Sequence, residues 1–221
     1  EGDSESVSLD QYLERMGENQ DKIYYITADS LSAARNSPHL EIFRKKDIEV
    51  LLLTDRVDEW LMSHLTEYKD KKFQSVAKGE LDLGELDTEE DKEKQEKAAE
   101  EHKSLLDQTR QALGDTVKDV RVSSRLTDSP ACLVVDDYDM SQNLARVLKQ
   151  LGQDAPMPTP IMEINVEHPI VNRMEKETDD ERFAELAKLL YEQSLLAEGG
   201  QLDDPAAFVH RLNKLMLDMS N

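Results

Sequence analysis

Residues 22–65 read KIYYITADSLSAARNSPHLEIFRKKDIEVLLLTDRVDEWLMSHL and alternate strand-like with helix-like segments. Lys22–Thr27 is rich in aromatic and β-branched residues, which predicts a strand. Residues 48–54 form a nearly unbroken apolar run, typical of a strand covered on both faces. The order strand, helix, strand, helix predicts parallel strands with right-handed crossovers. No glycine-rich loop follows either strand, so nothing in this unit predicts a phosphate site.

The flanking segments extend the unit on both sides. Residues 8–16 predict a short amphipathic helix before the first strand, and residues 73–77 a third short strand. Pro38 predicts an interruption of the helix that follows Asp29, because the residue before a proline avoids the helical region. A second helix is expected to begin after Asp55 and to run to about Tyr68.

Residues 80–101 change character, because Asp and Glu dominate and large apolar residues almost disappear after Leu86. This segment predicts a linker followed by the exposed start of a helix that Gly114 ends. We therefore expect two domains, residues 1–87 and residues 88–221. The second should contain strands at 117–126, 131–135 and 162–166 and a helix at 140–151. Two closing helices should follow, the first begun by a capping box at Thr178 and the second capped by Asp204 with Pro205 as its first residue. The expected fold class is α/β (α+β), with a small βαβ-type subdomain and a mixed α/β domain that ends in a helical hairpin.

The 221 residues carry a formal net charge of −21, which disfavours binding to nucleic acid or to an anionic membrane. Cys132 is the single cysteine, so no disulfide forms within the chain and a reducing, cytoplasmic location is expected. No apolar run approaches the roughly 20 residues that a membrane-spanning helix needs.

Candidate catalytic groups are few. Asp29, Asp55 and Asp136 follow predicted strands, where carboxylates hold magnesium in some phosphoryl-transfer enzymes. The simpler interpretation is that each aspartate caps the next helix. The five histidines show no metal-ligand spacing, and Cys132 lies within an apolar strand. We expect no metal site and no catalysis in this chain, with a magnesium-dependent phosphohydrolase as the alternative function.

Two apolar features point to surfaces. Trp60, Leu61 and Met62 are consecutive on a helix and therefore cannot all face one core, so at least one should be exposed or lie at a domain junction. Residues 140–151 predict a helix with an apolar stripe and a polar face; it either fills a core or binds a partner. The stripe consists of Met140, Leu144, Val147, Leu148 and Leu151.

The two closing helices carry more apolar residues than a two-helix hairpin can bury within itself. They either pack on their own domain or meet a second copy as a four-helix bundle. The residues expected in such a dimer interface are Phe183, Leu186, Leu189, Leu190, Phe208, Leu212, Leu215, Met216 and Met219.

Several segments resemble the heat-shock protein 90 family of chaperones. IYYITADSLSAARNSPHLE, EVLLLTDRVDEW and KFQSVAKGELDL resemble the end of that family's middle domain. SSRLTDSPACLVVDDYDMSQNLARVLKQ and LAEGGQLDDPAAFVHRLNKLM resemble its C-terminal domain in the bacterial form. The resemblance covers nearly the whole chain, and it implies a fragment without the nucleotide-binding N-terminal domain.

The resemblance implies a role for each surface. The closing helices match the family's dimerisation bundle, and Trp60 with the helix at 140–148 matches residues that contact partly unfolded client proteins. The implied client-binding residues are Trp60, Leu61, Met62, Met140, Leu144, Val147 and Leu148. The implied partners are a second copy, clients and co-operating chaperones. ATP and magnesium belong to the full-length family, and none is expected here. The ending LMLDMSN lacks the eukaryotic motif that recruits tetratricopeptide co-chaperones. A purely structural dimerisation scaffold, without client contact, is the remaining alternative.

Overall fold

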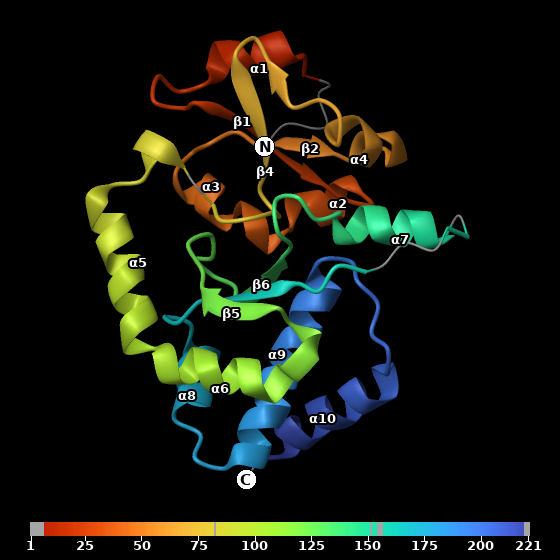
Figure 1. The fold of residues 1–221 in the computed structure, drawn as a ribbon. Helices are drawn as coiled ribbons and strands as arrows, with labels where there is room; N and C mark the ends of the chain where they lie inside the picture. The colour runs from red at the N-terminus through yellow and green to blue at the C-terminus, as the bar shows by residue number, and fades with distance from the viewer. Residues whose placement is uncertain (1–6, 82, 151, 154–156, 219–221) are drawn as a thin grey trace.

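The computed structural model describes residues 7–81, 83–150, 152–153 and 157–218. The chain forms an N-terminal unit and a C-terminal unit, which lie one above the other in Figure 1 and meet along a junction at mid-height. Each unit has a small mixed sheet covered by helices, so the expected mixture of α and β structure is confirmed. Within the described residues, no helix combines the length and the hydropathy needed to cross a bilayer.

The N-terminal unit has a four-stranded sheet in the order β2-β1-β4-β3. The strands are β1 (Lys22–Thr27), β2 (Leu51–Leu53), β3 (Glu67–Tyr68) and β4 (Lys71–Ser75). β1 is parallel to β2 and β4, as the strand-helix-strand order predicts, whereas β3 is antiparallel to β4. The helices are α1 (Leu9–Arg15), α2 (Leu31–Arg35), α3 (Glu41–Lys45) and α4 (Arg56–Met62).

The core of this unit lies between the sheet and its helices. Tyr24 and Phe43 meet edge to face with ring centroids 4.9 Å apart. Leu83 is also fully buried in this core, so part of the segment expected to be a linker packs firmly. β2 is only half-buried, contrary to expectation, because it lies at the edge of the sheet. The helix after Asp55 ends at Met62 rather than near Tyr68, since Tyr68 pairs in β3.

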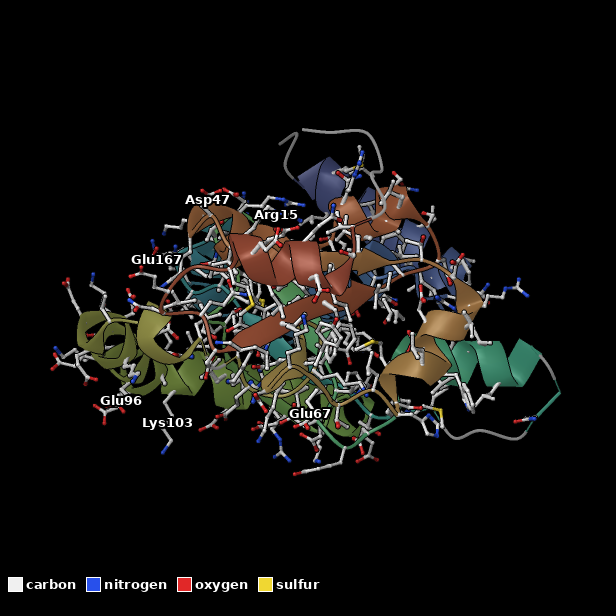
Figure 2. All side chains as sticks on the ribbon, turned by 90° about the horizontal axis from the view of Figure 1, so that it is seen from above. Arg15, Asp47, Glu67, Glu96, Lys103 and Glu167 are labelled. Carbon is white, nitrogen blue, oxygen red and sulfur yellow. The ribbon has the colours of Figure 1, made fainter. Side chains whose placement is uncertain are left out.

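α5 (Glu89–Glu101) and α6 (Lys103–Leu113) connect the two units. Thr88 caps α5 by accepting a hydrogen bond from Asp91 N, and no side chain of α5 is buried. Glu96 and Lys103 point away from the ribbon, as Figure 2 shows. The acidic segment is therefore a solvated helix, as its charge predicts. α6 in contrast buries Leu105 and Leu113 in the second core.

The C-terminal unit has a three-stranded sheet in the order β5-β7-β6. The strands are β5 (Asp119–Val122), β6 (Ala131–Val134) and β7 (Ile161–Ile164). β7 is parallel to β5 and antiparallel to β6. The helices are α7 (Gln142–Gln150), α8 (Pro169–Glu175), α9 (Asp180–Ala197) and α10 (Pro205–Asp218). The core of this unit is a buried cluster from β5, β6, β7, α6, α8 and α9.

Three predicted helix caps are wrong by one or a few residues. Ser30, not Asp29, caps α2, and its hydroxyl accepts from Ala33 N at 3.1 Å. Asp179, not Thr178, caps α9. The cap before α7 is Ser141 rather than Asp136, because five residues separate Asp136 from the first turn of that helix. Two other predictions are confirmed, since Asp55 is the N-cap of α4 and Asp204 caps α10.

Candidate functional site

The first candidate surface lies on α4. Val57, Trp60 and Leu61 are 61, 64 and 46% exposed, whereas Met62 is half-buried. The expectation that at least one of Trp60, Leu61 and Met62 is exposed is confirmed. We call Val57, Trp60 and Leu61 the α4 patch. Val57 was missed by the sequence analysis, although its spacing of three and four from Trp60 and Leu61 places it on the same face.

α7 packs beside α4, as both Figure 1 and the contacts between the two helices show. Ser141 joins them: its hydroxyl donates to Glu59 Oε2 at 2.7 Å and accepts from Leu144 N at 3.0 Å. The same side chain therefore caps α7 and ties it to α4. Because Glu59 is buried directly beside Trp60 in the chain, this contact holds α7 next to the α4 patch.

The apolar stripe of α7 is half-buried rather than fully enclosed. Ala145, which the sequence analysis did not single out, has no exposed surface. The four predicted client-binding residues of this region share intermediate exposure; they are Met140, Leu144, Val147 and Leu148. Leu151 lies outside the described residues. Tyr138, in the preceding loop, is fully exposed and was also missed. Helix and loop thus continue the apolar surface of the α4 patch.

Lys78, which is half-buried, holds the loop that precedes α7. Lys78 Nζ donates to the carbonyl of Asp139 at 2.6 Å, just before α7. Burial lowers the pKa of Lys78, although Glu59 and Asp137 nearby oppose the shift. Burial, together with the Glu59 charge, raises the pKa of Tyr25 to about 12. Lys78 therefore keeps its place by hydrogen bonding in a partly desolvated setting, and it holds the chain where α7 begins.

The second candidate surface is the hairpin of α9 and α10. Phe183, Leu189 and Leu190 are buried by this chain itself, so the alternative that α9 packs on its own domain applies to them. Leu186 is half-buried against the same core. These four residues lie against the chain's own core and not on an accessible face of the hairpin.

The rest of the hairpin is more accessible. Phe208, Leu212 and Leu215 are half-buried, and Met216 is 58% exposed. Met219 lies outside the described residues. Three further apolar side chains are exposed on the same two helices, and they are Leu196, Val209 and Leu217. An apolar surface therefore runs along α10 and the last turn of α9.

The strand-end aspartates do not converge. Asp29 Oδ2 accepts from Arg146 Nη2 at 2.5 Å, the Asp55 N–H donates to the Asp58 carboxylate, and Asp136 pairs with Lys118. Among the residues that the structure describes, no group of three or more His, Cys, Asp or Glu side chains could hold a metal ion. Cys132 is buried, and burial raises the pKa of its thiol well above the ordinary value. The thiol is therefore held in its protonated, unreactive form at neutral pH.

Known proteins match the chain almost from end to end. The family model described as Hsp90 protein matches residues 1–220. The chain belongs to the Hsp90 family. Proteins named "Chaperone protein HtpG" from Dechloromonas aromatica, Aromatoleum aromaticum and Pseudoalteromonas translucida are 59, 60 and 56% identical to it, over 97–98% of this chain. The chain spans about a third of the length of these relatives.

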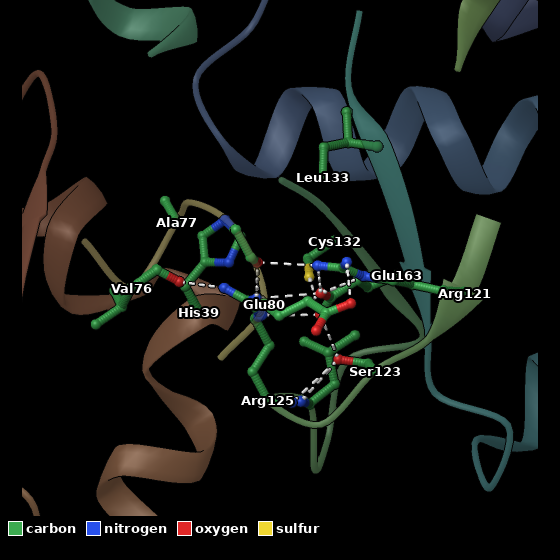
Figure 3. Close-up of polar contacts among 12 residues, drawn as sticks. His39, Val76, Ala77, Glu80, Arg121, Ser123, Arg125, Cys132, Leu133 and Glu163 are labelled. Atoms are coloured by element: carbon green, nitrogen blue, oxygen red, sulfur yellow. Dashed lines mark hydrogen bonds and ion pairs between the residues drawn. The ribbon is translucent and has the colours of Figure 1, made fainter. Parts of the chain in front are cut away.

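The two units of this Hsp90-family chain are locked together by buried charges (Figure 3). Arg125 is fully buried and donates to the carbonyl of Gly79 at 2.8 Å and to that of Val76. It also pairs with Glu163 of β7 at 2.8 Å. Burial raises the pKa of the Glu163 carboxyl, but Arg125 and Arg121 outweigh that effect and leave it below the ordinary value. One guanidinium thus bridges β7 and the segment that follows β4, a feature that sequence patterns did not predict.

Hydrogen bonds of Glu41 form a second connection between the two units. The Glu41 carboxylate accepts hydrogen bonds from the backbone N–H groups of Thr127, Asp128 and Ser129 and from the Ser129 hydroxyl. Burial raises the pKa of Glu41, but these hydrogen bonds, led by that from Asp128, lower it overall. The N-terminal unit therefore caps a turn of the C-terminal unit, and the sheets are joined further by the Gly79 N–H donating to the Val135 carbonyl at 2.7 Å.

Proposed function

We propose that this chain is the client-binding and dimerising part of an Hsp90-type molecular chaperone of the bacterial form. The observation that carries the proposal is the accessible apolar surface shared by α4 and α7, which two partly buried polar contacts hold in place. Family membership supports it, since the relatives at 56–60% identity are named as chaperones. Exposed apolar surface of this kind marks binding sites on soluble proteins.

The proposed mechanism is physical. Each copy of the chain offers Trp60, Leu61 and the α7 stripe to apolar segments of a partly unfolded protein. Each large side chain that becomes fully buried contributes roughly 1.5–3 kcal/mol to the free energy of binding. A dimer formed through the α9–α10 hairpin places two such surfaces at high local concentration, which strengthens binding without any new contact. The net charge of −21 opposes the self-association that such exposed apolar surface would otherwise favour.

The ATP-driven part of the cycle is assigned to a domain outside this chain. We infer that ATP and magnesium bind there, that the chain itself performs no catalysis, and that it works in the cytoplasm. The separate engagement of Asp29, Asp55 and Asp136 by Arg146, α4 and Lys118 leaves the phosphohydrolase alternative without a supporting observation. We also infer that clients and co-operating chaperones, but no tetratricopeptide co-chaperones, are its partners.

A substitution experiment separates client binding from a purely structural scaffold. Trp60→Arg combined with Met140→Glu should reduce suppression of the aggregation of a heat-denatured test enzyme. The matched control is Ile170→Glu on α8, because Ile170 is 50% exposed but does not belong to the α4–α7 surface. Undiminished suppression by the double variant, at unchanged dimer content, would favour the scaffold.

A further inference from the structure

The C-terminal end of α9 is held by three other parts of the chain. α9 rises to the junction in Figure 1, and the chain then returns downward to α10. At that end the Glu198 carboxylate accepts from Leu133 N of β6 at 2.7 Å and lies 3.2 Å from His39 Nε2 of the N-terminal unit. Gly199 follows with a φ of +75°, a conformation that favours glycine. The turn between α9 and α10 is therefore fixed to the rest of the chain at its first residues.

Arg146 connects this point to α7. Its Nη1 donates to the carbonyl of Gly199, and its Nη2 donates to Asp29 at 2.5 Å. Asp29 immediately follows Ala28 at the end of β1, so one planar guanidinium joins α7, the first sheet and the turn that leads into α10. Lysine could not make the same pair of contacts, because only the guanidinium fork presents two donors at fixed angles.

The start of α7 is tied to α4 through Glu59, the neighbour of Trp60 in the chain. Ser141 holds it to Glu59, and Ala145, next to Arg146 in the chain, is fully buried. α7 is therefore fastened to α4 at its start and to the hairpin at its middle. A displacement of the turn at Gly199 would be transmitted to the helix that carries half of the apolar surface.

We propose that Arg146 is a positioning residue that couples the dimerisation hairpin to the client-binding surface. The proposal rests on the proposed function. When two hairpins pack together, the turn at Gly199 shifts with them, and α7 moves against the α4 patch through Arg146. By linkage, anything that binds the α4–α7 surface more tightly in the dimer strengthens dimerisation by the same factor.

The chain provides its own reporter, because Trp60 is its single tryptophan and belongs to the α4 patch beside α7. The 221-residue chain is diluted from high to low concentration. Its mass is followed by sedimentation and the quenching of Trp60 fluorescence by acrylamide is measured at each step. In the wild type, the quenching constant should change along the same curve as the mass, so that both give one dissociation constant.

Arg146→Gln breaks the contacts with Gly199 and Asp29. In this variant the mass should still fall on dilution, but the quenching constant of Trp60 should no longer change along the same curve. Lys149→Gln is the matched control, because it removes the same charge from an exposed side chain of the same helix and should behave as the wild type. Asp29→Asn weakens the same link without altering α7, and it serves as the second test if Arg146→Gln alters the circular dichroism.

The outcomes separate the two ideas. A wild type that stays a single copy at all concentrations defeats the proposed dimer, and the coupling with it. A wild type whose mass falls while Trp60 quenching stays constant defeats the coupling alone. If the mass and the quenching constant change together in Arg146→Gln and Asp29→Asn as they do in the wild type, the assignment to Arg146 is wrong.

Discussion

At the scale of single residues, Arg125 and Glu163 dominate the junction. Both side chains are almost completely enclosed. Without Arg125 the buried Glu163 carboxylate keeps Arg121 and Ser123 as partners but loses its fully buried counter-charge. Arg125→Met should therefore lower the free energy of unfolding by about 3–5 kcal/mol. Urea denaturation followed by circular dichroism measures this. The double variant Arg125→Met with Glu163→Leu should recover much of the loss, and a single variant as stable as the wild type would contradict the role assigned to the pair.

Glu41 gives a prediction in pH. Its pKa in the folded chain lies below the ordinary value of 4.5, because four hydrogen bonds at the Thr127–Ser129 turn outweigh burial. A carboxyl with a depressed folded pKa contributes stability above its unfolded pKa and loses it as pH falls through the folded pKa.

Stability should thus decline below about pH 4.5 in the wild type. Glu41→Gln should cost about 1–3 kcal/mol at pH 7 and make the decline shallower. Thermal melts at pH 7, 5, 4 and 3 test both parts. The exposed Glu14, which caps no turn in the structure, supplies the control variant Glu14→Gln, and an equally steep decline in Glu41→Gln and wild type would refute the assignment.

Sequence reasoning performed unevenly at this scale. It placed Trp60 and Leu61 at the surface correctly, because consecutive large apolar residues cannot share one helix face. It missed Arg125, Glu163 and Glu41, since an arginine or glutamate becomes buried only through partners that are distant in the chain. It also assigned the cap of α2 to Asp29, whereas the adjacent Ser30 takes that position and frees Asp29 for Arg146.

At the scale of elements, the stability of α7 depends on Ser141, the residue that precedes the helix and caps it. Ser141 satisfies the Leu144 N–H at the start of the helix and binds Glu59 at the same time. Ser141→Ala should destabilise α7 by about 1 kcal/mol, whereas Ser141→Thr keeps an oxygen at the cap and should lose little. Hydrogen exchange of the α7 amides is the measurement, with the α9 amides as internal reference. Exchange in α7 that is unchanged by Ser141→Ala would contradict the role of this contact.

Element positions followed from the sequence where periodicity was strong. β1, α9 and α10 agree with the predicted segments because an aromatic strand and two capped, amphipathic helices have clear signatures. The predictions failed where tertiary pairing decided the outcome. The helix after Asp55 stops at Met62 because the chain is needed for β3, and the apolar run at 48–54 yields only the short edge strand β2.

At the scale of the whole molecule, the division of the hairpin is the main result. Its buried residues, such as Phe183 and Leu190, complete the core of the C-terminal unit, while Met216 and Leu217 on α10 remain exposed. The sequence pattern assigned Phe183, Leu190 and Met216 to one interface, because period alone does not distinguish a face covered by the same chain from one covered by another.

Substitutions on α10 should therefore separate assembly from folding. Met216→Glu combined with Leu217→Glu should weaken dimerisation without unfolding the chain, since both side chains are more than half exposed in the single copy. Phe183→Ala, in contrast, should cost about 3–5 kcal/mol of stability. Sedimentation and thermal melting, applied to both variants, distinguish the two effects. Loss of folding in the α10 variant would place those side chains in a core instead.

The central claim is that two copies of this chain join through the α9–α10 hairpin and present their two α4–α7 apolar surfaces together. Sedimentation equilibrium of the 221-residue chain over a wide range of micromolar concentrations tests it most directly. We expect a species of twice 25.2 kDa, which Met216→Glu with Leu217→Glu should convert to single copies. A mass of 25.2 kDa for the wild type throughout that range would contradict it.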